Sequence, residues 1–181
     1  KSDGVLLGVP DAPIQLVEFS DFECPFCKKF HSAFRNAQAK FGDRVSLLYV
    51  HYPLSMHKFA RPAAKAAECA RAQGRFGEIS DAIFSGQDSL GLKSWHDFAQ
   101  DAKVADLGLF ESCLKDSRTD AIVSRGIAAG DSFGVQYTPT VLINGWLYAV
   151  PPTEPELEAT IRGILGGSSP SDAAAKAAQR E

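Results

Sequence analysis

Two cysteines spaced by two residues stand where a predicted strand meets a predicted helix, and this junction constrains the fold most. The stretch reads Phe19-Ser20-Asp21-Phe22-Glu23-Cys24-Pro25-Phe26-Cys27. The apolar run 14–19 is typical of a strand, and Pro25 suits a first helical position, where its missing N–H costs nothing. Cys24 would lie over unpaired amides at the positive end of a helix dipole, which favours its thiolate. Half a zinc site or a structural disulfide fits the bare spacing too, but the strand and helix favour a redox pair.

Composition narrows the function classes further. The 181 residues are 45% hydrophobic, enough for one elaborated domain with a substantial core. A net charge of −3 gives no electrostatic case for binding nucleic acid or an anionic membrane. No run approaches the roughly 18 apolar residues that span a bilayer. Lys1-Ser2-Asp3-Gly4 leads straight into the domain, so we expect a mature or trimmed chain without a signal peptide.

The hydrophobic pattern places strands near both ends of the chain and helices between them. Apolar runs predict strands at 5–7, 14–19 and 45–50, and a helix over 25–40 makes the last two a parallel β-α-β unit. Five helical segments follow, to about residue 130. Asn144-Gly145 is typical of a hairpin turn between two more strands, and a final helix follows. This order predicts an α/β protein with a thioredoxin fold, a mixed sheet flanked by helices, that carries an inserted all-helical domain.

These segments give a division into three parts. A discontinuous thioredoxin-like domain is expected over 1–58 and 117–167, with the helical insertion over 59–116. Residues 168–181 are small, polar and alanine-rich, and are expected to form a flexible C-terminal tail.

Two further residues are candidates for the site. Glu18 is an acid inside an apolar run; it is either an outward-facing carboxylate or a buried acid that exchanges a proton with Cys27. Pro139 stands at the entrance of a predicted strand, where a trans proline is the ordinary expectation. A cis proline is rare in general, at about 5–6% of such bonds.

Three stretches together resemble the DsbA-like thiol–disulfide oxidoreductases over roughly residues 4 to 166. They are the segment 19–27 given above, Ala66-Ala67-Glu68-Cys69-Ala70, and Gly134-Val135-Gln136-Tyr137-Thr138-Pro139-Thr140-Val141-Leu142-Ile143-Asn144-Gly145. The resemblance implies that Cys24 is the nucleophile and Cys27 the resolving cysteine. It also implies that Pro139 is cis and faces this pair, that the backbone of Thr138 pairs with substrate, and that Glu18 is the buried acid.

The chain departs from the best-known oxidases of that family between the cysteines. They carry a histidine where this chain has Phe26, which with Pro25 is expected to tune the redox properties of the pair. Asp21 and Glu23 add negative charge that should raise the pKa of Cys24 if they lie close. A less stabilised thiolate would make a weaker oxidant. Thr138 also recurs in isomerase and reductase relatives, so oxidase is a narrow first choice.

Cys69 and Cys113 fall on helices of the predicted insertion. Two buried free thiols and a structural disulfide fit them equally well; such a disulfide would stabilise the fold by roughly 4 kcal/mol on the chain-entropy model. The four histidines show no metal-ligand spacing, and no metal is expected. His31, one helical turn after Cys27, is expected at the surface or lining a groove.

We therefore expect a thiol–disulfide oxidoreductase that exchanges a Cys24–Cys27 disulfide with cysteines of extracytoplasmic, most simply periplasmic, protein substrates as a dithiol oxidase. No cofactor beyond that disulfide is expected. Partners would be unfolded or partly folded proteins and a redox partner such as a membrane oxidase, with the chain a monomer. Alternatives are a reductase or isomerase using the same site, and a non-enzymatic binding module with a structural bridge. Enzymes that act on glutathione conjugates share the fold but generally lack the second cysteine.

Overall fold

The computed structural model describes residues 4–179. The first three and last two residues, where the predicted thioredoxin-like domain begins and the predicted tail ends, lie outside this range. A five-stranded mixed sheet in the order β1-β3-β2-β4-β5 forms the centre. Its strands are β1 (Val5–Leu7), β2 (Ile14–Ser20), β3 (Val45–His51), β4 (Thr140–Ile143) and β5 (Trp146–Leu147). β2 and β3 are parallel and the other pairs antiparallel, which confirms the predicted β-α-β unit and the terminal hairpin.

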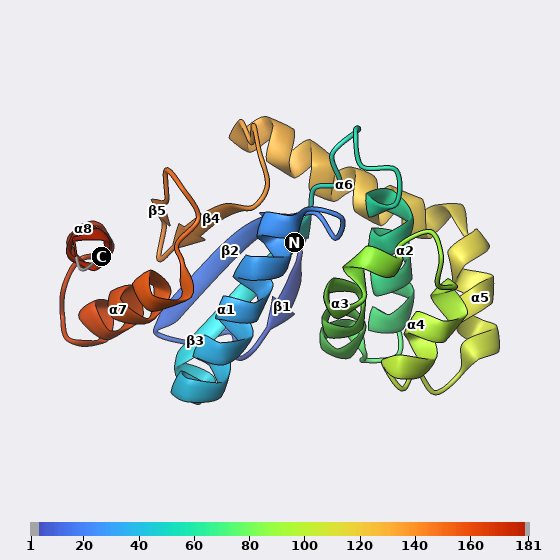
Figure 1. The fold of residues 1–181 in the computed structure, drawn as a ribbon, viewed down its shortest axis with the longest axis horizontal. Helices are drawn as coiled ribbons and strands as arrows, with labels where there is room; N and C mark the ends of the chain where they lie inside the picture. Colours follow the sequence, from blue (N-terminus) through green and yellow to red (C-terminus); the bar gives the residue numbers. More distant parts are fainter. Residues whose placement is uncertain (1–3, 180–181) are drawn as a thin grey trace.

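Helices cover both faces of the sheet and gather at one end of it. Figure 1 shows α2 to α5 clustered beyond the β1 side, with α7 and α8 at the opposite end. In order they are α1 (Pro25–Phe41), α2 (Ala60–Arg71), α3 (Phe76–Ser85), α4 (Trp95–Asp101), α5 (Leu107–Lys115), α6 (Ser117–Phe133), α7 (Glu154–Leu165) and α8 (Pro170–Ala178), with short 3₁₀ turns η1 (Gly42–Arg44) and η2 (Gln87–Ser89). This is the predicted thioredoxin fold with inserted helices.

The apolar core has three parts. One lies between the sheet and α1 and α7, around Phe30, Phe34, Leu157 and Ile161. A second, smaller cluster lies on the other face, around Phe19 and Val50 and the end of α6.

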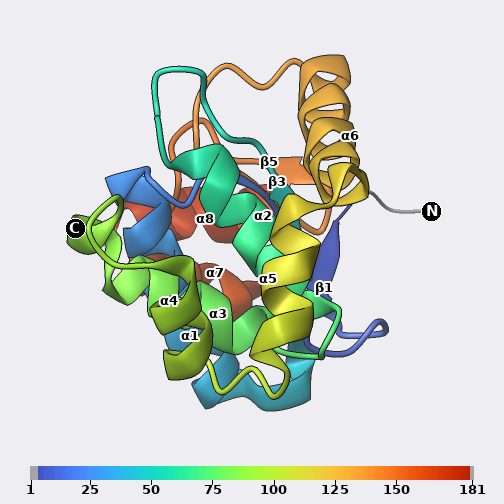
Figure 2. The same cartoon turned by 90° about the vertical axis from the view of Figure 1, so that its right-hand side faces the viewer.

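The third cluster continues from the cysteine end of α1 into the inserted helices, which stand nearest the viewer in Figure 2. Phe22 and Tyr49 contribute to it from the sheet side, and Phe76, Ile83 and Phe98 from the insertion. The insertion therefore shares a core with the sheet end that carries the cysteines. Within residues 4–179, no helix has both the length and the apolar character that crossing a bilayer requires.

The prediction of a flexible tail after residue 167 is wrong for the described residues 168–179. Ser169 caps α8 by accepting a hydrogen bond from the Asp172 amide, and Pro170 starts the helix. Ala173 and Ala177, one turn apart, are both buried. Small side chains suit a close contact between helices, and α8 packs on α7 where Gly163 faces Ala173. The alanines of this segment therefore allow α8 to pack closely on α7.

Candidate active site

The two cysteines lie at the start of α1, where the sequence places them. Cys24 is the N-cap residue, with extended backbone angles, and Pro25 occupies the first turn. Cys27 follows on the inner face of the helix. Both are free thiols, and their residues are 4% and 0% exposed.

The sulfur of Cys24 lies among groups that favour its thiolate. When protonated, the Cys24 thiol donates to the carbonyl oxygen of Thr138 at 3.3 Å, a contact that does not itself favour the thiolate. The pKa of Cys24 is lowered from 9.0 to about 5, chiefly because the Cys27 thiol donates a hydrogen bond to the thiolate, and burial opposes this only in part. The backbone amides of Cys27 and Phe26 and the side chain of Thr138 lower the pKa further.

The rise in the pKa of Cys24 that was expected from Asp21 and Glu23 is not found: the pKa is lowered, and neither acid is among the causes of the shift. Their carboxylates accept hydrogen bonds from backbone amides of the surrounding loops. Asp21 accepts from the amides of Glu23 at 2.7 Å and Leu54 at 2.8 Å and pairs with His57 Nδ1 at 2.7 Å. Glu23 accepts from the Phe59 amide. Both acids thus hold the loop that leads into α2.

Cys27 has the opposite character. Burial raises its pKa well above 9.0, and its hydrogen bond to Cys24 and the negative charges of Glu18 and Cys24 raise it further. The Asp21 amide donates to its sulfur at 3.4 Å and opposes the shift only weakly. The pair therefore consists of one sulfur that holds a thiolate and one that holds a proton.

Glu18 is buried, as the resemblance implies. Its residue is 0% exposed on β2, and its Oε1 oxygen accepts a hydrogen bond from Ser20 at 2.7 Å. Burial raises the pKa of Glu18 from 4.5 to about 8, against the hydrogen bond from Ser20 and with a smaller contribution from the charge of Cys24. At neutral pH this carboxyl group carries a proton.

The Thr138–Pro139 segment lies across the site from α1. The peptide bond between these residues is cis, and both residues are buried. A groove of about 1180 Å³ opens beside them; its lining includes Phe26, Tyr137, Pro139, Val150 and Pro151. Phe26 is 62% exposed there, with the Lys29 ammonium 5.6 Å from its ring centroid.

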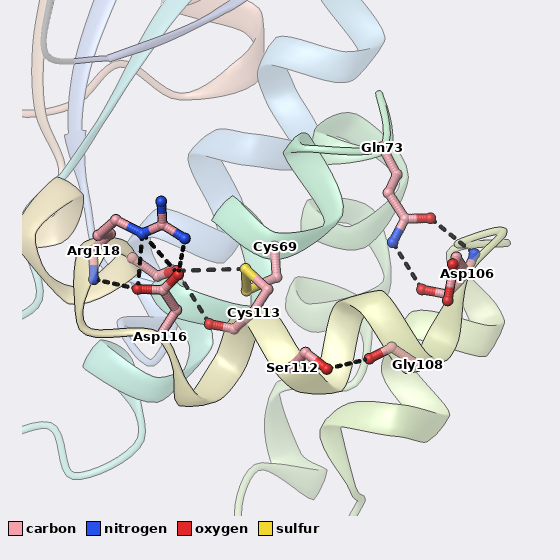
Figure 3. Close-up of a disulfide and its surroundings, with 9 residues drawn as sticks. Cys69, Gln73, Asp106, Gly108, Ser112, Cys113, Asp116 and Arg118 are labelled. Carbon is pink, nitrogen blue, oxygen red and sulfur yellow. Dashed lines mark hydrogen bonds and ion pairs between the residues drawn. A yellow bond between two sulfur atoms is a disulfide. The ribbon is translucent and has the colours of Figure 1, made fainter.

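The second cysteine pair forms a disulfide, so of the two predictions for it the structural bridge holds. Cys69 on α2 and Cys113 on α5 are joined with a sulfur–sulfur distance of 2.02 Å (Figure 3). Nearby, Gln73 and the backbone of Asp106 exchange two hydrogen bonds of 2.8 Å. The disulfide and this exchange both tie α2 to α5.

Several contacts at the site have no sequence signal. His31 is buried and lines a small hollow between α1 and α3, so it is groove-lining, one of the two positions expected; its Nε2 lies 2.6 Å from Asp81 Oδ1 on α3. Gln87, in η2, donates to the carbonyl oxygens of Phe22 and Cys24 at 2.8 and 3.0 Å. These partners lie about 50 to 65 positions away in the chain, so local pattern does not reveal them. Among residues 4–179, no three metal-binding side chains are grouped to hold an ion.

The comparisons with known proteins agree with this geometry. The family model described as Thioredoxin matches residues 1–162. BdbD from Bacillus subtilis, in an oxidised crystal structure, superposes with a TM-score of 0.77 at 25% identity, over 91% of this chain and 94% of that one. DsbA2 from Pseudomonas aeruginosa is 31% identical, over 76% of this chain and 78% of its own, with a TM-score of 0.57. The chain belongs to the thioredoxin family and, within it, to the DsbA-like proteins.

Its curated relatives are longer proteins. A Na(+)/H(+) antiporter NhaA 1 of Mycolicibacterium gilvum is 37% identical over 143 residues, which is 76% of this chain but 23% of the antiporter. An NhaA 3 of Salinispora tropica is 36% identical over 141 residues, or 76% and 21%. The chain thus spans less than a quarter of these two relatives. Its fold and its Cys24–Cys27 pair are those of a thiol–disulfide oxidoreductase.

Proposed function

We propose that the chain is a dithiol oxidase, which passes its Cys24–Cys27 disulfide to pairs of cysteines in protein substrates. The observation that carries this proposal is the contrast between the two sulfurs: the pKa of Cys24 is about 5, while that of Cys27 is well above 9.0. A stabilised thiolate stabilises the reduced form, and a stabilised reduced form makes the disulfide a stronger oxidant. Phe26 replaces the histidine of familiar oxidases, but Cys27, Thr138 and backbone amides supply the hydrogen bonds instead.

The reaction then proceeds in two exchanges. A substrate thiolate attacks the Cys24 sulfur of the oxidised chain; a substrate–Cys24 disulfide forms, and Cys27 leaves as a thiolate. Cys27 takes a proton, for which Glu18, a buried acid with a raised pKa that interacts electrostatically with Cys27, is the proposed donor. A second substrate thiolate attacks the substrate sulfur of the mixed disulfide, so the substrate is oxidised and Cys24 leaves as a thiolate. Two electrons have moved to the chain, and no cofactor is needed beyond the cysteine pair.

Substrates would lie extended beside Thr138 and Pro139, paired through main-chain atoms, with side chains in the groove next to Phe26. Main-chain pairing reads little sequence, so unfolded or partly folded proteins with free cysteines are the proposed substrates. The proposed setting is extracytoplasmic, most simply periplasmic, with the chain acting as a monomer and a membrane oxidase restoring the disulfide.

The test is the reduction potential of the Cys24–Cys27 pair, measured in glutathione buffers with alkylation of free thiols. A potential between roughly −120 and −180 mV is expected, the range from DsbA to protein disulfide isomerase. A potential near −250 mV or below, approaching the thioredoxin value of about −270 mV, would instead assign a reductase. Failure to equilibrate at all would mean a structural bridge.

Single-cysteine variants test the roles of the two sulfurs. Cys24→Ser should abolish exchange because the sulfur that the substrate thiolate attacks is gone. Cys27→Ser should accumulate mixed disulfides with a reduced, unfolded substrate in the presence of an oxidant, since the resolving sulfur is missing. Non-reducing electrophoresis distinguishes these outcomes, and full dithiol oxidation by either variant would refute the assignment.

A further inference from the structure

Gln87, in the turn η2 that follows α3, reaches from the helical insertion to the backbone that carries Cys24. Its side-chain amide donates to the carbonyl oxygen of Phe22 at 2.8 Å and to the carbonyl oxygen of Cys24 at 3.0 Å. Carbonyl oxygens only accept hydrogen bonds, so the nitrogen of this amide, and not its oxygen, must face the cysteine loop. One side chain of the insertion thus holds the backbone on both sides of Glu23.

The turn that carries Gln87 is itself fixed on the core of the insertion. A Cβ at Gly86 would lie 2.8 Å from the ring of Phe98, so the backbone here packs directly against that buried side chain. Within the turn, the Ser89 amide donates to the Gly86 carbonyl at 2.8 Å and the Leu90 amide to the Gln87 carbonyl at 3.1 Å. Gln87 therefore transmits the position of the insertion to the cysteine loop.

The two carbonyl groups depend on Gln87 to different degrees. Phe22 is 1% exposed, and no other residue between 4 and 179 donates to its carbonyl oxygen. The carbonyl of Cys24 also accepts the first hydrogen bond of α1, from the Lys28 amide at 3.2 Å. Without Gln87, the Phe22 carbonyl would be buried and unpaired, and the Cys24 carbonyl would lose one of its two restraints.

The direction of the Cys24 carbonyl bears on the hydrogen bonds that its sulfur receives. The backbone amides of Phe26 and Cys27, in the first turn of α1, are among the donors that lower the pKa of Cys24. Pro25 lies between them and Cys24, and its ring fixes its φ angle. The ψ angle of Cys24, which also sets the direction of its carbonyl, is therefore the main freedom left between the sulfur and these amides.

We propose that Gln87 is a positioning residue for Cys24, through which the helical insertion sets how strongly the Cys24–Cys27 disulfide oxidises. The inference deepens the proposed function and rests on it, since it concerns the same exchange at the same pair. Gln87 acts on the backbone of Cys24 and not on its sulfur: it holds the peptide group that orients the sulfur toward its donors.

The reduced chain should depend on Gln87 more than the oxidised chain does. In the oxidised chain, the sulfur–sulfur bond itself holds Cys24 beside Cys27, whereas in the reduced chain only noncovalent contacts do so. A contact shifts an equilibrium only by the difference between its strengths in the two states. Loss of Gln87 should therefore destabilise the reduced form more, and a less stable reduced form makes the disulfide a weaker oxidant.

Gln87→Met keeps the length of the side chain and removes both donors. The readout is the equilibrium constant for reduction of the Cys24–Cys27 disulfide by two molecules of glutathione, which gives the dithiol and one glutathione disulfide. This constant should fall about fivefold, the ratio that corresponds to one ordinary hydrogen bond. In the reduced chain, the ultraviolet absorbance of the Cys24 thiolate should appear at higher pH in the variant than in the unaltered chain.

Two further variants separate this role from a general loosening of the insertion. Gln73 exchanges two hydrogen bonds of 2.8 Å with the backbone of Asp106, which link α2 to α5, so Gln73→Met should lower stability in urea and leave the equilibrium constant unchanged. Gln87→Lys keeps donors at the position, so its constant should equal or exceed that of the unaltered chain. An unchanged constant in Gln87→Met, an equal fall in Gln73→Met, or an equal fall in Gln87→Lys would overturn the proposal.

The titration of the Cys24 thiolate separates a failure of this inference from a failure of the proposed function. If the unaltered chain has the potential of a reductase but Gln87→Met still moves the titration to higher pH, the oxidase assignment fails and the role of Gln87 stands. If the unaltered chain has the potential of an oxidase and Gln87→Met moves neither the constant nor the titration, the inference alone fails.

Discussion

At the scale of single residues, the site separates three titratable groups by environment. Cys24 lies at a helix N-terminus among hydrogen-bond donors, and its pKa falls to about 5. Cys27 and Glu18 are buried where charge is costly, so the pKa of each rises, that of Glu18 to about 8. Groups of divergent pKa side by side are the arrangement that acid–base chemistry requires.

Burial of Glu18 should cost stability near neutral pH, which Glu18→Gln would recover. The unfolded carboxyl loses its proton above about 4.5, while the folded one keeps it up to about 8. Between these values the folded chain binds more protons, so the free energy of unfolding falls as the pH rises. By pH 7 the loss amounts to about 3 kcal/mol.

Urea unfolding of the reduced chain measures this effect. Glu18→Gln should gain on the unaltered chain from about pH 5 to about pH 7.5, whereas Glu154→Gln, at an exposed position, should not. A difference that does not grow with pH would contradict the raised pKa.

At the scale of elements, the inserted helices depend on links to one another. The disulfide between α2 and α5 joins residues 44 positions apart. Replacing both cysteines (Cys69→Ala with Cys113→Ser) should lower the free energy of unfolding by about 4 kcal/mol on the chain-entropy model. Cys69→Ala alone should lose as much, since either change removes the bridge. Urea unfolding measures this loss, and a value well under 1 kcal/mol would show that the bridge constrains the unfolded chain little.

Alanine is predicted to have opposite effects at two glycines, Gly163 in the contact between α7 and α8 and Gly108 on the exposed face of α5. A Cβ at Gly163 would stand 2.9 Å from the Cβ of Ala173, too close without movement of α8. Gly163→Ala should therefore loosen α8 and speed amide hydrogen exchange there. Gly108→Ala, in the exposed first turn of α5, meets at closest a side-chain oxygen at 3.4 Å and should stabilise by up to about 1 kcal/mol. Unchanged exchange in α8 would contradict the close packing.

At the scale of the whole molecule, the cysteine loop belongs to the sheet and the helical insertion together. Asp21, Glu23 and Gln87 tie the loop to the start of α2 and to η2. A shift of the insertion relative to the sheet would therefore move the loop that carries Cys24.

Asp21→Asn tests this connection. The buried carboxylate accepts from two amides and pairs with His57, and an asparagine amide cannot accept at both positions. The free energy of unfolding should fall by about 2 kcal/mol, the usual value of a hydrogen bond to a charged group. Limited proteolysis should cut more readily between β3 and α2. His57→Gln alters only one partner of Asp21, so its free energy of unfolding should fall by less. If Asp21→Asn were as stable as the unaltered chain, the connection between the cysteine loop and the insertion would be contradicted.

The sequence by itself determined the strand order along the chain, the position of Cys24 and Cys27 at a helix start, and the hairpin at Asn144-Gly145, because these depend on hydrophobic period and local turn chemistry. Only the tertiary structure decided the rest. The pairing of Cys69 with Cys113, the partners of Asp21 and Glu23, and the meeting of Tyr49 with Glu18 join residues distant in the chain. The direction of the pKa shift of Cys24 depended on the hydrogen bonds that reach its sulfur in the folded chain, chiefly the one from Cys27, and α8 depended on a small-residue contact with α7. Burial and hydrogen bonding arise from the packed fold, so no local pattern carries them.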